Sequence, residues 1–131
     1  AAGGVNAVIM SVAVGPGPRT PEGDADARAV AEEKLAAALK LVEDSAGGVV
    51  LATSAAEIEA AKAAGKPAIL LGFQNARSLE GDVNALDYFY DAGVRVFGLN
   101  HLGHNDFSDS SRPLYDGATK SYEPTEEHCR H

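Results

Sequence analysis

Polar side chains follow two apolar segments of this sequence, at the points where predicted strands end. Gln74 comes directly after the apolar run 68–73, and His101 follows the run 94–99 through Asn100. In parallel α/β folds, ligands and reacting groups gather where strands end and the next loops begin, so both side chains would open into one mouth. An imidazole there could contact a substrate or a metal ion. The spacing therefore predicts a small-molecule site that includes Gln74 and His101.

Both residues also have a purely structural interpretation. The amide of Gln74 could cap the turn that follows it, and the sequence supports this interpretation as well as the first. His101 stands at the end of a predicted strand between Gly98 and Gly103. That place favours a substrate or metal contact over a hydrogen-bonded structural histidine.

The loop after His101 carries a second group of polar residues: His104, Asn105, Asp106 and Asp109. Imidazole and carboxylate groups this close together could bind Zn²⁺, but zinc sites usually show Cys ligands or a helical pair four residues apart. We expect instead a loop tied by local side-chain-to-backbone hydrogen bonds, with turns at residues 109–111. The C-terminal sequence 128–131 also contains metal-binding residue types, yet a metal site needs rigid outer support, so we expect none there.

An alternation of strands and helices must position these residues. Apolar segments predict strands, and amphipathic segments between them predict helices; the strands are expected at 5–14, 49–52, 68–73 and 94–99, and the helices at 24–44, 54–64 and 82–92. This order predicts a mostly parallel sheet with helical crossovers. Because the strands show no apolar–polar alternation, we expect both faces of the sheet to be covered.

Helix-capping residues mark the expected helix starts. Asp24 or Asp26 would cap the first helix, and Ser54 with Glu57 forms a capping box for the second. Asp82 would cap the third helix. The first helix has one apolar stripe, made of Ala31, Leu35, Ala38, Leu39 and Val42.

Composition restricts the class of protein. The net charge of −8 argues against a nucleic-acid partner, whose phosphates need clustered Lys and Arg. A single Cys129 excludes an intramolecular disulfide. No apolar run approaches the roughly 20 residues of a membrane span. Localisation is left open.

Several sequence patterns resemble the membrane (renal) dipeptidase family of zinc metallopeptidases. The most specific is Ala92-Gly93-Val94-Arg95 followed by Asn100-His101 and then Asp109-Ser110. The segment 53–58 before Gly65-Lys66, and the segment 3–5, match the family as well. The similarity covers about residues 3–127.

The resemblance implies a fold, an activity and roles for two residues. Members are (β/α)₈ metallohydrolases with a two-zinc site at the C-terminal face of the barrel, and they hydrolyse the amide bond of dipeptides. His101 inherits the position of a histidine that contacts the substrate. Gln74 occupies the position of a glutamate that bridges both zinc ions, and a neutral amide is a poor bridging ligand because it brings no charge.

The resemblance also implies that most of the metal site is missing. The family's His-x-Asp pair on the first strand, and two His and one Asp from strands beyond the fourth, have no counterpart in residues 1–131. We therefore expect one partial domain over 1–131, about half of a (β/α)₈ barrel of parallel β/α units, with an irregular tail from about 110 to 131. We assign no catalytic residue and expect the isolated chain to be inactive.

Four hypotheses about the chain stay open. It could be an inactive relative of a zinc dipeptidase, which we favour, or a half-barrel completed by a second copy or by the remainder of a barrel. It could instead be a non-catalytic α/β binding module, or hold a new metal site in the 101–109 loop or the tail. Two unpaired strand edges make homo-oligomers the structural expectation.

Overall fold

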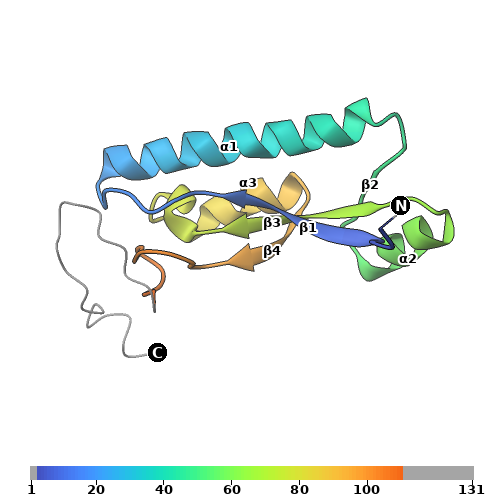
Figure 1. The fold of residues 1–131 in the computed structure, drawn as a ribbon. Helices are drawn as coiled ribbons and strands as arrows, with labels where there is room; N and C mark the ends of the chain where they lie inside the picture. Colours follow the sequence, from blue (N-terminus) through green and yellow to red (C-terminus); the bar gives the residue numbers. More distant parts are fainter. Residues whose placement is uncertain (1–2, 111–131) are drawn as a thin grey trace.

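A parallel four-stranded sheet forms the centre of the protein, which a computed structural model describes over residues 3–110 (Figure 1). Its strands are β1 (Ala7–Ala13), β2 (Val50–Leu51), β3 (Ala68–Gln74) and β4 (Val94–Gly98). β3 lies in the middle and pairs with β1 along one side. On its other side β2 pairs with the start of β3, and β4 pairs with its end. The predicted parallel α/β fold is confirmed.

Helix α1 (Pro21–Asp44) starts earlier than the sequence predicted. Its cap is Thr20, not Asp24 or Asp26, and the Thr20 side chain accepts a hydrogen bond from Gly23 N at 3.1 Å. Pro21 occupies the first turn, where its fixed φ suits the helix and its missing N–H costs nothing. The predicted stripe is correct: Ala31, Leu35 and Ala38 are buried, and Leu39 and Val42 pack against them.

Helix α2 (Ala55–Ala63) begins at its predicted cap, whereas Asp82 caps a 3₁₀ turn before α3 (Leu86–Asp91), whose own N-cap is Ala85 without a side-chain hydrogen bond. Ser54 and Glu57 form the capping box of α2. Hydrogen bonds from Thr53, above all from its backbone N–H, lower the pKa of the Glu57 carboxyl. The 3₁₀ turn that Asp82 caps is η2 (Val83–Ala85), which leads into α3. A further 3₁₀ turn, η1 (Ala76–Leu79), directly follows β3.

One face of the sheet carries the hydrophobic core. α1 runs along the strands on this side (Figure 1), and its Leu35 belongs to the same buried cluster as Leu71 and Val94 of the sheet. Phe89 of α3 is fully buried there, with its ring centroid 4.9 Å from that of Phe73. The shorter α2 packs against the start of β3, at the end of the sheet remote from the loops after β1, β3 and β4.

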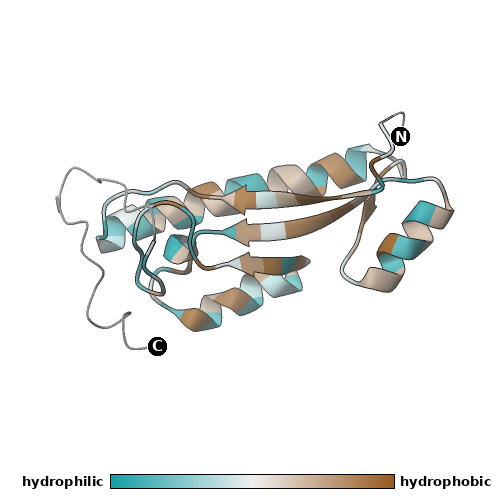
Figure 2. Cartoon of the chain, turned by 60° about the horizontal axis from the view of Figure 1, so that its bottom comes forward, coloured by the Kyte–Doolittle hydropathy of each residue, from teal (hydrophilic) through white to brown (hydrophobic). Residues whose placement is uncertain are grey.

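The opposite face is open along most of its length, which corrects the expectation that both faces are covered. Ile9 is 60% exposed and Val96 is 37% exposed, and these two side chains meet over Gly72. The strands are mainly hydrophobic along their length (Figure 2), as in a strand with cover on each face. Residues 3–110 supply that cover on one face alone.

Two further predictions concern the membrane and the tail. None of the helices within residues 3–110 has the length and apolar character that a membrane span requires. The chain from residue 102 to 110 is irregular. The predicted tail from about 110 to 131, and with it the sequence 128–131, lies beyond the described residues.

Candidate functional site

The C-terminal ends of three strands meet at one edge of the sheet. Ala13 is in register with Gln74, and Gln74 is in register with Gly98. Gln74 is half-buried and lies on the open face, the face that Gly72 also occupies two residues earlier. His101 is exposed in the loop that follows β4. Both residues therefore follow strand ends at this edge, while their role in a common site stays a prediction.

Asn75 is the junction between the loops at this edge. It is 1% exposed and has a φ of 82°, a left-handed conformation that Asn adopts more readily than most residues. Its side-chain Oδ1 accepts hydrogen bonds from Arg77 N at 3.3 Å and from Asn105 Nδ2 at 3.1 Å, and its Nδ2 donates to Val14 O at 3.4 Å. One amide therefore joins the chain segments that follow β1, β3 and β4.

Side-chain-to-backbone hydrogen bonds hold the chain at His101 and at its neighbour Asn100. Ser110 Oγ donates to His101 O at 3.0 Å, and the preceding Asn100 donates from Nδ2 to Ser108 O at 2.8 Å. The imidazole of His101 stays exposed, and within residues 3–110 it has no hydrogen-bond partner. The loop thus presents the imidazole to the surroundings of the sheet edge.

His104 lies inside the same loop and is tied to it. Its Nδ1 is 3.1 Å from Asp109 Oδ1 and accepts a hydrogen bond from Ser110 N at 3.0 Å. Its Nε2 is buried without a partner among the described residues. Within residues 3–110 no group of three or more His, Cys, Asp or Glu side chains could hold a metal ion. For this loop the hydrogen-bonded interpretation agrees with the structure.

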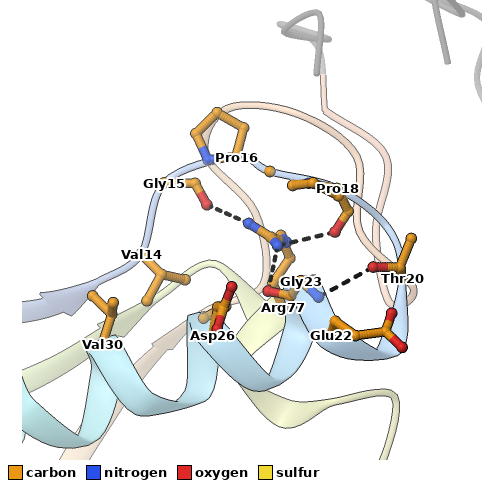
Figure 3. A pocket seen from close by; sticks show the side chains of 12 residues that line it. Val14, Gly15, Pro16, Pro18, Thr20, Glu22, Gly23, Asp26, Val30 and Arg77 are labelled. Atoms are coloured by element: carbon orange, nitrogen blue, oxygen red, sulfur yellow. Dashed lines mark hydrogen bonds between the residues drawn. The ribbon is translucent and has the colours of Figure 1, made fainter. Parts of the chain in front are cut away.

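Arg77 supports the β1–α1 loop from below (Figure 3). Its guanidinium donates to three carbonyl oxygens: Nη1 to Gly15 O at 2.9 Å, and Nη2 to Pro18 O at 3.1 Å and Gly23 O at 2.7 Å. Arg77 Nε also reaches Asp24 Oδ1 at 3.4 Å. Burial raises the pKa of the Asp24 carboxyl, although the charge of Arg77 acts in the opposite direction.

A pocket of about 400 Å³ opens beside this guanidinium (Figure 3). Its wall is largely apolar, from Val14, Pro16 and Val30, and the carboxylates of Glu22 and Asp26 stand at it. Each nitrogen of the Arg77 guanidinium already donates within the protein. Four of the five N–H groups of the guanidinium therefore hold this loop and the start of α1.

Sequence reasoning missed Asn75 and Arg77 as parts of the site, and it named Asn105 without its contact to Asn75. A signal existed for Asn75, because an Asn directly after a buried strand is typical of a left-handed turn position. For Arg77 there was none, since its carbonyl partners lie 54 to 62 residues away in the chain.

Comparisons with known proteins identify one family. The sequence profile described as "Membrane dipeptidase (Peptidase family M19)" matches residues 1–125. A search of curated proteins gave no match.

Solved structures resemble this chain in fold. The probable dipeptidase PvdM from Pseudomonas aeruginosa has a TM-score of 0.76 and 31% sequence identity, over 83% of this chain and 28% of its own. An amidohydrolase from Pseudomonas aeruginosa has a TM-score of 0.65 and 29% identity, over 79% and 29%. The dipeptidase AC, a metallopeptidase of family M19, shares the fold with a TM-score of 0.60 at 22% identity, over 75% and 31%. The chain thus spans less than a third of the length of each structure.

Proposed function

The chain belongs to the membrane dipeptidase family, peptidase family M19, and on that premise we propose that it supplies part of a metal-dependent site that hydrolyses the amide bond of dipeptides. One observation carries this proposal. Gln74 and His101, to which the resemblance gives positions in the family's site, lie at one edge of a parallel sheet, where α/β enzymes place their chemistry.

His101 is the substrate-contacting residue in this proposal. Its imidazole is exposed at the sheet edge, while hydrogen bonds to its backbone fix the loop. An N–H of the imidazole would donate to the scissile carbonyl and hold the negative charge that develops on that oxygen in the transition state. Such a donor lowers the barrier when its position is fixed before the reaction.

The residues of this chain do not fit a two-zinc site by themselves. Gln74 offers a neutral amide oxygen where the family has a bridging carboxylate, and an amide does not offset the charge of two divalent cations. Residues 3–110 contain no cluster of three or more ligand side chains that could supply the rest. We therefore propose no step through a metal on this chain, and we propose that the isolated chain is inactive.

The open face of the sheet supports a further part of the proposal. Ile9 and Val96 are apolar and exposed there, and Gln74 stands at the C-terminal end of the same face. In a closed (β/α)₈ barrel this face would line the interior, which side chains fill. We propose that residues 1–131 form one partial barrel domain, completed either by a second copy or by further β/α units.

The first test is metal content together with hydrolysis of a small panel of dipeptides. We expect the purified chain to hold no stoichiometric zinc and to release no amino acids. Zinc near one equivalent with turnover would contradict the proposed inactivity. Dipeptide binding without turnover that is lost in His101→Ala would support the proposed substrate contact. No dipeptide binding at all would contradict the proposed site and leave only the family fold.

A second test restores the family's carboxylate. Gln74→Glu adds a charge at the proposed metal position, so Zn²⁺ affinity should rise about tenfold or more if metal ligands from a second copy approach that face. The matched control is Asn6→Asp, which adds the same charge beside the start of β1, at the other end of the strands. Equal Zn²⁺ affinity in both variants would argue that Gln74 does not face a metal position.

A further inference from the structure

We infer that the buried amide pair Asn75–Asn105 is a positioning element, which fixes the loop carrying His101 against the end of β3. The inference rests on the proposed function, because the pair matters for binding only if the His101 imidazole contacts the substrate. The two side chains are each 1% exposed, and Asn105 Nδ2 donates to Asn75 Oδ1 at 3.1 Å. No other side-chain-to-side-chain hydrogen bond between residues 3 and 110 joins the loop after β3 to the loop after β4.

Asn105 uses all the hydrogen-bonding capacity of its side chain. Besides the bond to Asn75, its Nδ2 donates to Leu99 O at 2.7 Å. Its Oδ1 accepts from Phe107 N at 2.9 Å and from Ser108 N at 3.0 Å. Because the side chain is buried, water cannot replace these bonds, and a side chain of another shape would leave several polar groups unpaired.

Asn75 supplies the fixed end of the link. Its backbone N donates to Gly98 O at 3.0 Å, at the end of β4. Its left-handed φ of 82° turns the chain sharply after Gln74, in a conformation that few residues other than Gly and Asn adopt. The side chain that receives Asn105 therefore starts from a backbone anchored to both β3 and β4.

Hydrogen bonds continue from Asn105 to His101. Ser108 O accepts both from Asn105 N at 3.1 Å and from Asn100 Nδ2 at 2.8 Å. Asn100 is the neighbour of His101 in the chain. The imidazole itself has no hydrogen-bond partner within residues 3–110, so this network holds the backbone from which it projects. The network connects the end of β3 to the backbone at His101.

Two variants remove the link in different ways. Asn105→Leu keeps a similar side-chain size and deletes both the donors and the acceptor, and Asn75→Gly deletes the acceptor while it keeps the left-handed backbone. Asn75→Asp retains an oxygen at the acceptor position but loses the donor to Val14 O, so it is not used as a rescue. Asn6→Ala, an exposed amide beside the start of β1, is the control.

The measurements are the NMR resonances of the His101 imidazole and the dissociation constant of the dipeptide Ala-Ala, used as the probe. We expect Asn105→Leu and Asn75→Gly to shift the imidazole resonances and to weaken Ala-Ala binding by about tenfold. A tenfold change corresponds to the net contribution of about one hydrogen bond. Asn6→Ala should leave the resonances near those of the unmodified chain. A purely structural role would lower the melting temperature without moving the resonances.

Unchanged His101 resonances in folded Asn105→Leu would overturn the inference. If that variant does not fold, hydrogen exchange in the unmodified chain decides: the Phe107 and Ser108 amides should be protected, and fast exchange at both would overturn it. If the unmodified chain binds no Ala-Ala, the proposed function fails, while the resonance shifts still decide whether the amide pair positions His101.

Discussion

Arg77 and Gly23 are joined by a hydrogen bond of 2.7 Å from the guanidinium Nη2 to the carbonyl oxygen, which links the turn after β3 to the first turn of α1. The same guanidinium binds the carbonyl oxygens of Gly15 and Pro18, and its side chain is 6% exposed. Arg77→Ala would remove these hydrogen bonds and leave the half-buried Asp24 carboxylate without its Arg77 partner. We expect a loss of about 3–5 kcal/mol in the free energy of unfolding, measured by chemical denaturation.

Two variants separate charge from geometry at this position. Arg77→Lys keeps the charge but loses the planar fork, so its loss should lie between zero and that of Arg77→Ala. Lys40→Ala removes an exposed ion pair with Asp44 four residues along α1, and it should cost at most about 0.5 kcal/mol. Equal losses for Arg77→Ala and Lys40→Ala would show that the buried guanidinium contributes no more than a surface charge.

Gly23→Ala should destabilise the protein although alanine is the better helix former. In an isolated helix the change would gain up to about 1 kcal/mol. Here the added Cβ would lie 2.4 Å from Pro18 O, a backbone atom that the Arg77 hydrogen bond also holds. We expect a net loss of roughly 1–3 kcal/mol in denaturation, from overpacking. Ala25→Gly, at an exposed position of the same helix, is the control and should lose about 1 kcal/mol by propensity alone.

The stability of the protein should depend on the protonation of Asp24. Burial raises the pKa of this carboxyl above its usual 3.8, so the folded state binds the proton more tightly than the unfolded state does. By linkage, the stability contributed by Asp24 is complete below 3.8 and is lost as pH rises through the raised pKa. Asp24→Asn has no carboxyl to titrate at this position. The difference in unfolding free energy, unmodified chain minus Asp24→Asn, should therefore decrease as pH rises from 3.8 through the raised pKa.

The measurement for Asp24 is urea denaturation at several pH values for both proteins, with Asp26→Asn as the control. Asp26 is exposed on the same helix. Differences that change with pH equally in Asp24→Asn and Asp26→Asn, or a difference that rises with pH for Asp24→Asn, would contradict the assigned direction.

The order of strands and helices could be predicted because local signals mark it. Ser54 with Glu57, Asp82 and Gly93 stand at helix ends, and each acts there in the structure. The start of α1 was misplaced because Asp24 is as good a cap as Thr20 by residue type. The Pro that follows Thr20 is the sign that decides between them.

Long-range polar contacts could not be predicted in the same way. Arg is a residue type usually found at the surface, so nothing local predicts that Arg77 is buried. Asn105 contacts Asn75, which lies 30 residues earlier in the sequence. The edge at which Gln74 and His101 lie could be predicted, because apolar runs in the sequence mark where the strands end. The contacts of the buried amides and the guanidinium that support this edge depend on the fold, so no periodic pattern in the sequence predicts them.

Substitution of Ile9 tests whether the open sheet face associates. Ile9 is 60% exposed and lies against Gly72 in the middle of that face, beside strand edges that are unpaired within residues 3–110. We expect the unmodified chain to form oligomers and Ile9→Lys to raise the dissociation constant about tenfold or more, because a charge replaces apolar area that association would bury. Val83→Lys is the matched control, since Val83 is 57% exposed in η2. Sedimentation velocity over a range of concentrations measures both, and a monodisperse monomer of the unmodified chain would refute association through this face.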